Sequence, residues 1–356
     1  MVEKDLFYKG SKKFRIGHPK ICTYICQGIR DRGKTTFWLA EAAGRSIDNI
    51  LDHNAENPNK FTLLRRSEEQ IKEVVQKGIL NGVKNVPEYR NKLRGFVHEK
   101  VWRDNIILYN DNEEHIEVGY VEDLNNVKGK AVEDCDCMIF DEYVEAQRSK
   151  YKGGYGGSQE PNLLAKLDET YFRRRQNWLI MLGNFDSPTN PYHEVWGIPF
   201  GAMKYSDKKR GLLYEVDISQ DTIEAKHATN TGKRWQGTTY DQYSNGVSAL
   251  SQIDESLLTD KPMHAVHEYN FNICGTKMTV WKDPNDFVFY CHDEYKFDPT
   301  KPIYSVMTQD MKVNSLFLAY NNDVVRMMRM RFGQGRIRFN NQKTAALFMT
   351  LISLSE

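Results

Sequence analysis

The amino-acid sequence predicts an α/β protein, with a larger N-terminal part built on a parallel sheet and a smaller α+β part after it. Up to residue 198, short apolar runs of strand length alternate with segments whose apolar residues follow helical spacing. This alternation is typical of a parallel sheet that helices cover on both faces. The pattern changes near residue 190, because the segment 187–201 contains three prolines and two glycines. We therefore expect a first domain at 1–198, a linker at 199–224 and a second domain at 225–356.

The first domain opens with a buried strand at 21–27, which its short length and its Ile, Tyr and Thr content favour over a helix. A glycine-rich turn follows this strand, and then a helix over 34–47 and a second strand over 61–66. Ser67 is a favourable N-cap for the next helix, since two glutamates follow it in the first turn. The other predicted elements are a hairpin within 102–121 with its turn at Asn110–Glu113, a strand at 137–142, a glycine-rich loop at 151–158, a helix at 163–175 and a strand at 178–184.

Fewer elements are predicted in the rest of the chain. The linker contains one expected strand, in the sequence LLYEVDI at 212–218. In the second domain we expect two strands within 270–294, on either side of a Lys-Asp-Pro-Asn-Asp turn. A helix is predicted near 324–332, and a last helix with an apolar face at 344–353. Together these segments indicate a small α+β domain.

Length and composition limit the class of protein. The chain has 356 residues, of which 40% are hydrophobic and 27% charged, which suits a globular protein of about two domains. The formal net charge of +1 does not indicate a nucleic-acid partner, so a local basic patch has to carry that argument. No apolar run of about 18 residues predicts a membrane helix, and the N-terminus lacks the apolar core of a signal peptide. We therefore expect no membrane partner.

The six cysteines lie mostly in apolar runs, which favours reduced, buried thiols in a cytoplasmic protein. The first four of them could instead form a zinc site. Their C-x-C spacing is poor for zinc, so we do not favour that alternative.

The turn after the first strand carries a phosphate-binding motif. Gly28 to Thr35 matches G-x-x-x-x-G-K-[ST] at every fixed position. Backbone N–H groups of such a loop surround a phosphate, and the dipole of the following helix favours the same anion. Lys34 would reach the β- and γ-phosphates of ATP, while the Thr35 hydroxyl would bind Mg²⁺. The predicted nucleotide-binding residues are Gly28, Ile29, Arg30, Asp31, Arg32, Gly33, Lys34, Thr35 and Thr36. A plain glycine turn with a solvated lysine is the alternative, which the flanking strand and helix disfavour.

The strand at 137–142 ends in two carboxylates and resembles a Walker B segment. Asp141 would hold Mg²⁺ through water, and Glu142 would act as the general base on the attacking water. An acidic strand end is weak evidence alone, but it gains weight about a hundred residues after a complete P-loop. The adjacent glutamate, with a further strand predicted between the two motifs, favours the additional-strand catalytic-glutamate class of P-loop NTPases. Asn184, at the end of the next strand, could contact the γ-phosphate or the attacking water, or could simply end that strand.

Basic residues close the helix that precedes this last strand. Arg173, Arg174 and Arg175 could be ordinary cations at a helix C-terminus, or one of them could be an arginine finger that acts on a neighbouring subunit. Lys128 is a second candidate for the same role in trans. Arg30, inside the P-loop, could act in cis or contact a neighbour.

At these residues the chain resembles the DNA-packaging ATPase of phi-29-type small podophages. The resemblance covers nearly all of the chain, more weakly in the second domain. It is carried by an ordered set of motifs, namely Leu6-Phe7-Tyr8, a P-loop with Arg30 at its third position, Arg65-Arg66, Ile139-Phe140-Asp141-Glu142, the helix from Leu163-Leu164 to Tyr171-Phe172-Arg173, Gly183-Asn184, Asn190-Pro191-Tyr192 and Gly335 to Gln342. Thr35 replaces a serine of the relative, and the loop at 151–158 has no clear counterpart.

The resemblance implies an ATPase domain, a short linker domain and an RNase H-like C-terminal domain. It implies a ring, pentameric in that family, on the portal of an empty prohead, where ATP and Mg²⁺ drive translocation of double-stranded DNA. Such a protein would act in the host cytoplasm and transiently at the portal vertex of the prohead. Arg173 matches the trans-acting arginine of the family, and Lys128 matches its trans-acting lysine. Tyr8 and Arg66 are our candidates for the adenine pocket, and use of a packaging RNA stays open.

Two other functions are weighed against a motor. Large terminases cut DNA with two metals on clustered carboxylates, but the expected strand at 270–281 carries no acid. The acids Asp283, Asp286, Asp293 and Glu294 form a thin set, so we predict no nuclease activity. A nucleotide-dependent assembly protein is the other alternative.

The second domain also ends in a basic stretch without acids from 324 to 355, which suits phosphate contacts or a solvated face. Its cations are Arg326, Arg329, Arg331, Arg336, Arg338 and Lys343.

Overall fold

The computed structural model divides the chain into two compact units. The first comprises residues 1–185 and 203–246, and the second comprises residues 186–202 and 247–356. Within these units the structure describes residues 7–53, 59–124, 132–143, 160–173, 175–184, 191–198, 202–238, 241, 257–273, 275–293, 297–305, 315–317 and 323–354. No described helix has the length and apolar character needed to cross a bilayer.

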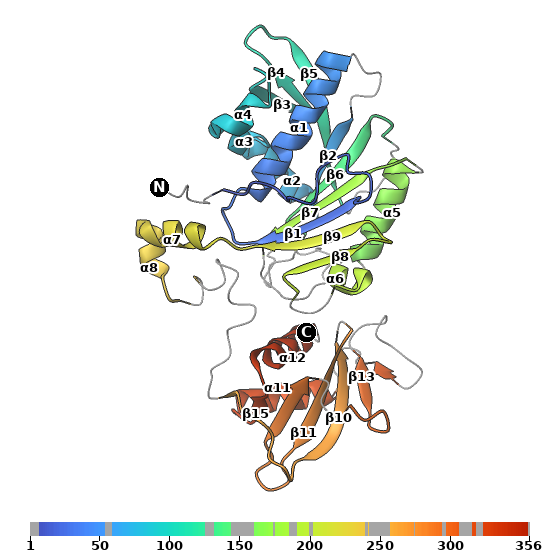
Figure 1. The fold of residues 1–356 in the computed structure, drawn as a ribbon, viewed down its shortest axis with the longest axis vertical. Coiled ribbons are helices and arrows are strands. Elements are labelled where there is room, and N and C mark those ends of the chain that lie inside the picture. Colours follow the sequence, from blue (N-terminus) through green and yellow to red (C-terminus); the bar gives the residue numbers. More distant parts are fainter. Residues whose placement is uncertain are drawn as a thin grey trace. The chain divides into compact units, whose positions relative to one another are not determined.

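The first unit is built on a nine-stranded sheet (Figure 1). The strands lie in the order β3-β4-β5-β2-β6-β7-β1-β9-β8. From β5 to β9 all neighbours are parallel, whereas β3, β4 and β8 are antiparallel to their neighbours at the two edges. The strands are β1 (Thr23–Gly28), β2 (Lys60–Arg65), β3 (His98–Trp102), β4 (Asn105–Tyr109), β5 (His115–Asp123), β6 (Cys135–Asp141), β7 (Trp178–Asn184), β8 (Lys204–Asp207) and β9 (Leu212–Asp217).

Helices cover this sheet on two faces. One face packs against α1 (Lys34–His53), with α2 (Glu68–Lys77), α3 (Asn81–Asn85) and α4 (Pro87–Asn91) beside it, and α5 (Glu160–Phe172) lies on the opposite face (Figure 1). The Ser67 side chain accepts a hydrogen bond from the backbone of Gln70, as expected for the N-cap of α2. All six residues of β2 are buried, which is typical of a parallel strand covered on both sides.

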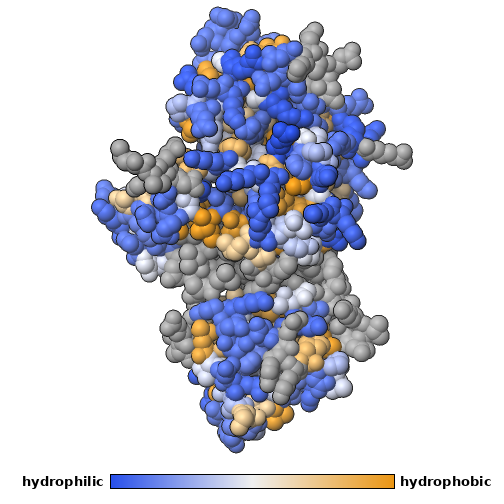
Figure 2. Space-filling view, in the orientation of Figure 1, coloured by the Kyte–Doolittle hydropathy of each residue, from blue (hydrophilic) through white to orange (hydrophobic). Residues whose placement is uncertain are grey.

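An aromatic cluster anchors α1 to the sheet. Phe14 stacks on Tyr24 of β1 with ring centroids 4.8 Å apart, and Trp38 of α1 lies 5.4 Å from both rings. The face of the molecule in Figure 2 is mostly hydrophilic where residues are coloured, in keeping with large apolar side chains being gathered inside. This packing fixes the start of α1, and with it the loop that joins β1 to α1.

The strand expected in a linker belongs to the main sheet. β9 pairs in parallel with β1 from Thr23↔Leu212 to Gly28↔Asp217, and β8 pairs with β9. The Tyr214 hydroxyl also donates to Gln27 Oε1 at 2.7 Å. The chain continues into α7 (Gln220–Ala228) and α8 (Asn230–Trp235). The sequence pattern missed this placement because one apolar strand after a proline-rich segment gives no sign of its partner.

The second unit contains a six-stranded mixed sheet in the order β14-β13-β10-β11-β12-β15. Its core joins strand residues such as Phe271 and Cys291 to Met328 of α11 and Phe348 of α12. The elements are α6 (Pro191–Trp196), β10 (Val266–Ile273), β11 (Thr276–Lys282), β12 (Phe289–Asp293), β13 (Ile303–Ser305), β14 (Ser315–Phe317), α11 (Asp323–Gly333), β15 (Ile337–Phe339) and α12 (Gln342–Leu354).

The strand expected at 270–281 is in fact two strands. β10 ends at Ile273 and β11 begins at Thr276, and Gly275 between them has a φ of 72°, a left-handed conformation that favours glycine. The Lys-Asp-Pro-Asn-Asp turn then leads into β12 as expected. The helices predicted near 324–332 and at 344–353 correspond to α11 and α12.

Candidate nucleotide site

The loop between β1 and α1 has the local geometry of a phosphate-binding loop. Gly33 has a φ of 82°, which favours glycine, and Asp31 has a φ of 65°. A Cβ on Gly28 would lie 2.4 Å from the Asp217 carbonyl oxygen, so the close approach of β9 requires glycine there. The Lys34 ammonium, at the first residue of α1, donates to the Ile29 carbonyl oxygen at 2.8 Å. Its side chain therefore extends back over the loop, where a phosphate could replace that carbonyl.

Arg32 ties the loop to β9 and α7. Its side chain is only 4% exposed, and Nε lies 2.6 Å from Asp217 Oδ2. The guanidinium also donates to the Thr222 hydroxyl at 2.9 Å. The Arg32 side chain is therefore engaged with the end of β9 and the start of α7, although its backbone stays in the loop. The sequence placed Arg32 among the phosphate-binding residues and gave no sign of Asp217 or Thr222.

The two carboxylates at the end of β6 meet the loop from the other side. The Thr35 hydroxyl donates to Asp141 Oδ1 at 2.7 Å. Arg65, at the end of β2, lies 2.5 Å from Asp141 Oδ2 and 2.7 Å from Glu142 Oε2. Glu142 has a φ of 57° and its side chain is 56% exposed, whereas Asp141 is buried. Because the carboxyl ends of parallel strands share one edge, Lys34, Asp141 and Glu142 lie where the sequence predicted them.

This donor set fits Mg²⁺ bound with a nucleotide. Magnesium is usually held by one or two carboxylates and by phosphate oxygens, and it keeps several waters. A hydroxyl and a carboxylate in contact, Thr35 and Asp141, supply such a partial shell beside a loop of backbone N–H groups. The described residues contain no group of three or more His, Cys, Asp or Glu side chains that could hold a metal by themselves.

Asn184 lies at the same edge of the sheet. It ends β7, which lies between β6 and β1, and it is in register with Gly28. Its neighbour in space is the first glycine of the loop, as a residue that senses a γ-phosphate would require.

Arg66 is buried and engaged with neighbouring segments. Its guanidinium is buried, lies 2.7 Å from Glu160 Oε2 and donates to the Glu142 carbonyl oxygen at 2.7 Å. It also donates to the carbonyl oxygen of Tyr143. Arg66 therefore joins the end of β6 to the first residue of α5, and the structure gives no support to its expected place in an adenine pocket.

Tyr8 lies on the loop, with its backbone N–H donating to the Arg32 carbonyl oxygen at 2.9 Å. Its ring is 3% exposed and its hydroxyl lies 2.7 Å from the Tyr24 hydroxyl. It borders a pocket of about 340 Å³ that Lys12, Lys13 and Asp217 also line. Of the two residues expected near adenine, Tyr8 is the one that lies beside both the loop and a pocket.

Helix α5 carries Arg173 to the opposite edge of the sheet. The helix starts at Glu160, beside Glu142, and its end lies near Val132, just before β6 begins. Arg173 is exposed and has a φ of 54°. It therefore lies away from the nucleotide site of its own chain. Lys128, Arg174 and the loop at 151–158 lie outside the described residues.

Comparisons with known proteins show the family of this chain. The podovirus DNA encapsidation protein (Gp16) family matches residues 117–353. The chain belongs to this family. No curated protein sequence matches the chain.

Two solved structures share the fold of this Gp16 family member. One is the bacteriophage Phi-29 viral genome packaging motor assembly, at 19% identity and a TM-score of 0.57, covering 99% of this chain and 100% of that chain. The other is the Phi-28 gp11 DNA packaging motor, at 13% identity and a TM-score of 0.51, covering 94% and 95% of the two chains. Both similarities extend over the two units.

The six cations of the basic stretch lie in four successive segments of this Gp16 family member. Arg326, Arg329 and Arg331 lie on α11, whose Val325 and Met328 face the core. Arg336 precedes β15, Arg338 lies within it, and Lys343 lies in the first turn of α12. Arg326, Arg336 and Lys343 are exposed, while Arg329, Arg331 and Arg338 are half-buried.

The acids considered for a nuclease are engaged separately. Asp283 accepts from the backbone of Asn285 and contacts His264 at 2.9 Å. Asp293 accepts from Asn340 at 2.7 Å and from Asn341 at 3.2 Å. Burial acts to raise the pKa of Asp293, but these hydrogen bonds outweigh it and lower that pKa. Glu294 lies outside the described residues.

Arg65 was not among the site residues predicted from the sequence and entered only through the family resemblance. In the structure it contacts both carboxylates of the candidate site. A usable signal was present, because the strand predicted at 61–66 belongs to a parallel sheet and its last residues, Arg65 and Arg66, had to reach the same edge as Asp141.

Proposed function

We propose that the chain is an ATP-driven motor that moves double-stranded viral DNA into a procapsid. Membership of the Gp16 family and the shared fold support packaging as the process. The cluster of Lys34, Thr35, Asp141 and Glu142 on one sheet edge supports ATP hydrolysis as the energy source. That cluster is the observation on which the proposal depends.

We place the motor in the additional-strand catalytic-glutamate class of P-loop NTPases. β7 lies between the strand of the P-loop and the strand of Asp141, and Glu142 follows that aspartate directly. Thr35 and Asp141 would hold Mg²⁺, which when bound would neutralise charge on the β- and γ-phosphate oxygens. Lys34 would donate to the same oxygens in place of the Ile29 carbonyl.

Glu142 would take the proton of the attacking water. In the present structure its carboxylate is paired with Arg65, so the glutamate has to leave that contact to orient a water molecule. Arg65 keeps its second contact, to Asp141, during such a movement. Asn184 would then lie beside the γ-phosphate, next to the first glycine of the loop.

The proposal includes a ring of identical subunits in which a neighbour supplies Arg173 or Lys128 in trans, together with Arg30 acting in cis or at the interface. The exposure of Arg173, far from its own nucleotide site, supports a role in trans. We further propose that the second unit is RNase H-like, lacks nuclease activity and binds DNA or the portal through its six cations. The motor would act in the host cytoplasm at the portal vertex of the prohead.

ATP turnover with and without double-stranded DNA and proheads tests the proposal. We expect turnover to rise with both partners, to be lost in Glu142→Gln with nucleotide binding retained, and to be lost together with binding in Lys34→Ala. A wild-type protein that binds no Mg-ATP would refute the motor. Binding without turnover would favour an assembly protein, and Mn²⁺-dependent cleavage of plasmid DNA would favour a terminase with a working nuclease.

A further inference from the structure

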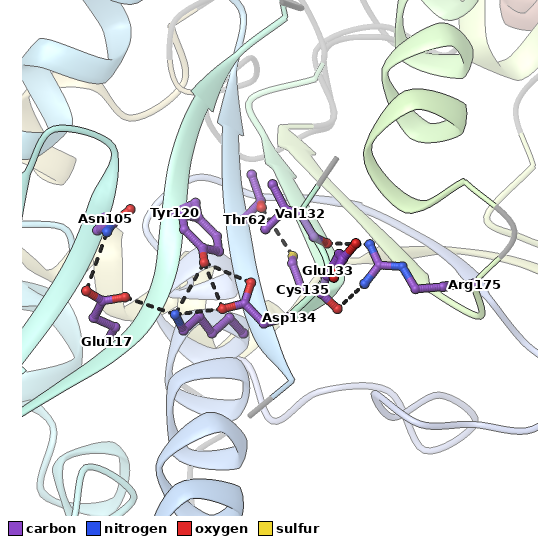
Figure 3. A network of polar contacts seen from close by, with 10 residues as sticks. Thr62, Asn105, Glu117, Tyr120, Val132, Glu133, Asp134, Cys135 and Arg175 are labelled. Atoms are coloured by element: carbon purple, nitrogen blue, oxygen red, sulfur yellow. Dashed lines mark hydrogen bonds and ion pairs between the residues drawn. The ribbon is translucent and has the colours of Figure 1, made fainter. Parts of the chain in front are cut away.

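A network of hydrogen bonds and ion pairs extends from the C-terminal end of α5 to the strands β6, β2 and β5 (Figure 3). Its first part is Arg175, whose side chain joins two segments of backbone. The guanidinium donates to the carbonyl oxygens of Val132 and Glu133, just before β6. It also donates to the Tyr171 carbonyl oxygen at 3.0 Å and, through Nε, to the Phe172 carbonyl oxygen at 3.3 Å. One side chain thus fixes the last turn of α5 to the start of β6.

The second part of the network is a cluster around Lys60, at the start of β2. The Lys60 ammonium is 9% exposed and lies 2.8 Å from Asp134 Oδ2 and 3.0 Å from Glu117 Oε2. The Tyr120 hydroxyl donates to Asp134 at 2.8 Å, and Asn105 contacts Glu117 at 3.5 Å. The backbone N–H of Lys60 also donates to the Asp134 carbonyl oxygen at 2.8 Å. We call these residues (Lys60, Glu117, Tyr120 and Asp134) the Lys60 cluster.

The two parts are continuous along the chain. Val132 and Glu133, which Arg175 holds, directly precede Asp134, which the Lys60 cluster holds (Figure 3). Three strands, β2, β5 and β6, therefore brace the segment on which the end of α5 rests. The Lys60 ammonium is only 9% exposed, so moving Asp134 away would leave a nearly buried cation with one carboxylate fewer, which is costly.

Arg173 lies two residues before Arg175, and its backbone conformation is unusual. It follows the last residue of α5 with a φ of 54°, where helices commonly place glycine. Within the described part of the chain its side chain makes no hydrogen bond or ion pair, and it is exposed. A strained position that keeps a long cation with no partner among the described residues indicates that the side chain is used elsewhere.

The length of α5 keeps Arg173 away from the nucleotide site of its own subunit. The helix has 13 residues and begins at the residue that Arg66 ties to the Glu142 backbone. At about 1.5 Å per residue, roughly 20 Å of helix separates Glu160 from Arg173. A guanidinium at that end is too far away to touch a nucleotide bound to its own subunit.

We propose that Arg175 and the Lys60 cluster are positioning residues, which hold the backbone of Arg173 so that its guanidinium meets a nucleotide bound to a second copy of this chain. This inference rests on the proposed function and adds to it the residues that aim the arginine. Arg175 takes part by fixing carbonyl oxygens of the last turn of α5 and of the segment before β6, and it does not itself contact the nucleotide.

The same contacts could merely cap a helix, and mixed subunits separate the two explanations. The full-length variant Arg175→Ala keeps its own P-loop but would present Arg173 poorly. The variant Glu142→Gln cannot hydrolyse ATP but would present Arg173 correctly. We expect Arg175→Ala alone to bind ATP with an unchanged KM while kcat falls on the order of 100-fold, the cost of a misplacement of about 1 Å. Adding Glu142→Gln subunits should then raise turnover, because they supply well-placed arginines to Arg175→Ala neighbours.

Three further variants make this test independent of folding. Arg94→Ala removes an arginine that bridges Asp48 and Asp52 at the surface, and it should leave kcat unchanged. Arg175→Lys keeps the charge but not the fork of donors, and Tyr120→Phe removes one donor to Asp134. These last two variants should each lower kcat by less than Arg175→Ala, without unfolding, and each should be rescued by Glu142→Gln subunits.

Failure of the inference and failure of the proposed function give different results. An inactive wild-type protein overturns the proposed function itself. An active wild type with unchanged kcat in Arg175→Ala and Arg175→Lys overturns the positioning role. A lowered kcat that Glu142→Gln subunits do not restore also overturns it, since the defect then lies within the subunit that carries the change.

Discussion

Replacing Arg173 by glycine should stabilise the protein while it abolishes ATP turnover. Arg173 has a φ of 54°, and this left-handed backbone conformation costs free energy in an arginine but not in a glycine. That penalty is about 1–2 kcal/mol, and the extra freedom of glycine in the unfolded chain offsets about 0.5–1 kcal/mol of it. The net gain is then about 0.5–1 kcal/mol, or roughly 1–4 °C in Tm for a unit of this size. If Arg173 acts in trans as proposed, its loss should also reduce kcat by about a thousandfold or more.

A matched change elsewhere separates backbone strain from catalysis. Glu113 has a φ of 62° in the turn between β4 and β5, and it is exposed. Glu113→Gly should therefore raise Tm by a similar amount and leave turnover unchanged. Thermal unfolding and steady-state turnover of both variants are the measurements. Two results would show that strain at Arg173 is not retained for function. One is wild-type turnover in Arg173→Gly, and the other is a lower Tm in Arg173→Gly while Glu113→Gly raises Tm.

Three other changes follow from buried charges of the first unit. Arg65→Met leaves Asp141 buried without its cation, so we expect the unfolding free energy to fall by about 3–5 kcal/mol. Added Mg²⁺ should partly restore this stability, which a series of Tm values against Mg²⁺ concentration would measure. Burial raises the pKa of Asp168 to about 6, so the folded state binds this proton more tightly than the unfolded state and stability falls as pH rises from about 4 to 6. Asp168→Asn should remove that slope and gain roughly 1–3 kcal/mol at pH 7, which unfolding curves between pH 4 and 7 would check. Asp217→Ala leaves the buried guanidinium of Arg32 without its carboxylate, so the unfolding free energy should fall by about 3–5 kcal/mol and ATP binding should weaken. An unchanged Tm with an unchanged nucleotide affinity would contradict that expectation.

Local signals in the sequence predicted where the residues of the candidate nucleotide site lie. The fixed residues of the P-loop, the acids that end β6 and the bounds of β7 all depend on short-range patterns of apolar residues, glycine and charge. Because parallel strands end at one edge, these patterns also placed Lys34, Asp141 and Asn184 together.

Contacts between distant segments were beyond the reach of such local patterns. The partner of β9 is β1, about 190 residues earlier in the chain, and no local pattern identifies it. Arg66 was a candidate for contacting adenine, because the sequence gives no sign that it pairs with Glu160, which lies 94 residues away. A glycine within an apolar run was also taken as part of one strand, although Gly275 turns the chain between β10 and β11.

The position of β9 limits where the chain can be divided. A protease cut or a gene truncation at residue 198, where a domain end was expected, would remove β8 and β9 from the sheet. It would also remove α7, which follows them. The lost segment supplies the carboxylate and hydroxyl that Arg32 needs, and it covers the edge of β1 that runs into the P-loop. An autonomous ATPase fragment should therefore extend through α8, beyond Trp235, even though this tail adds no residue to the phosphate cradle itself.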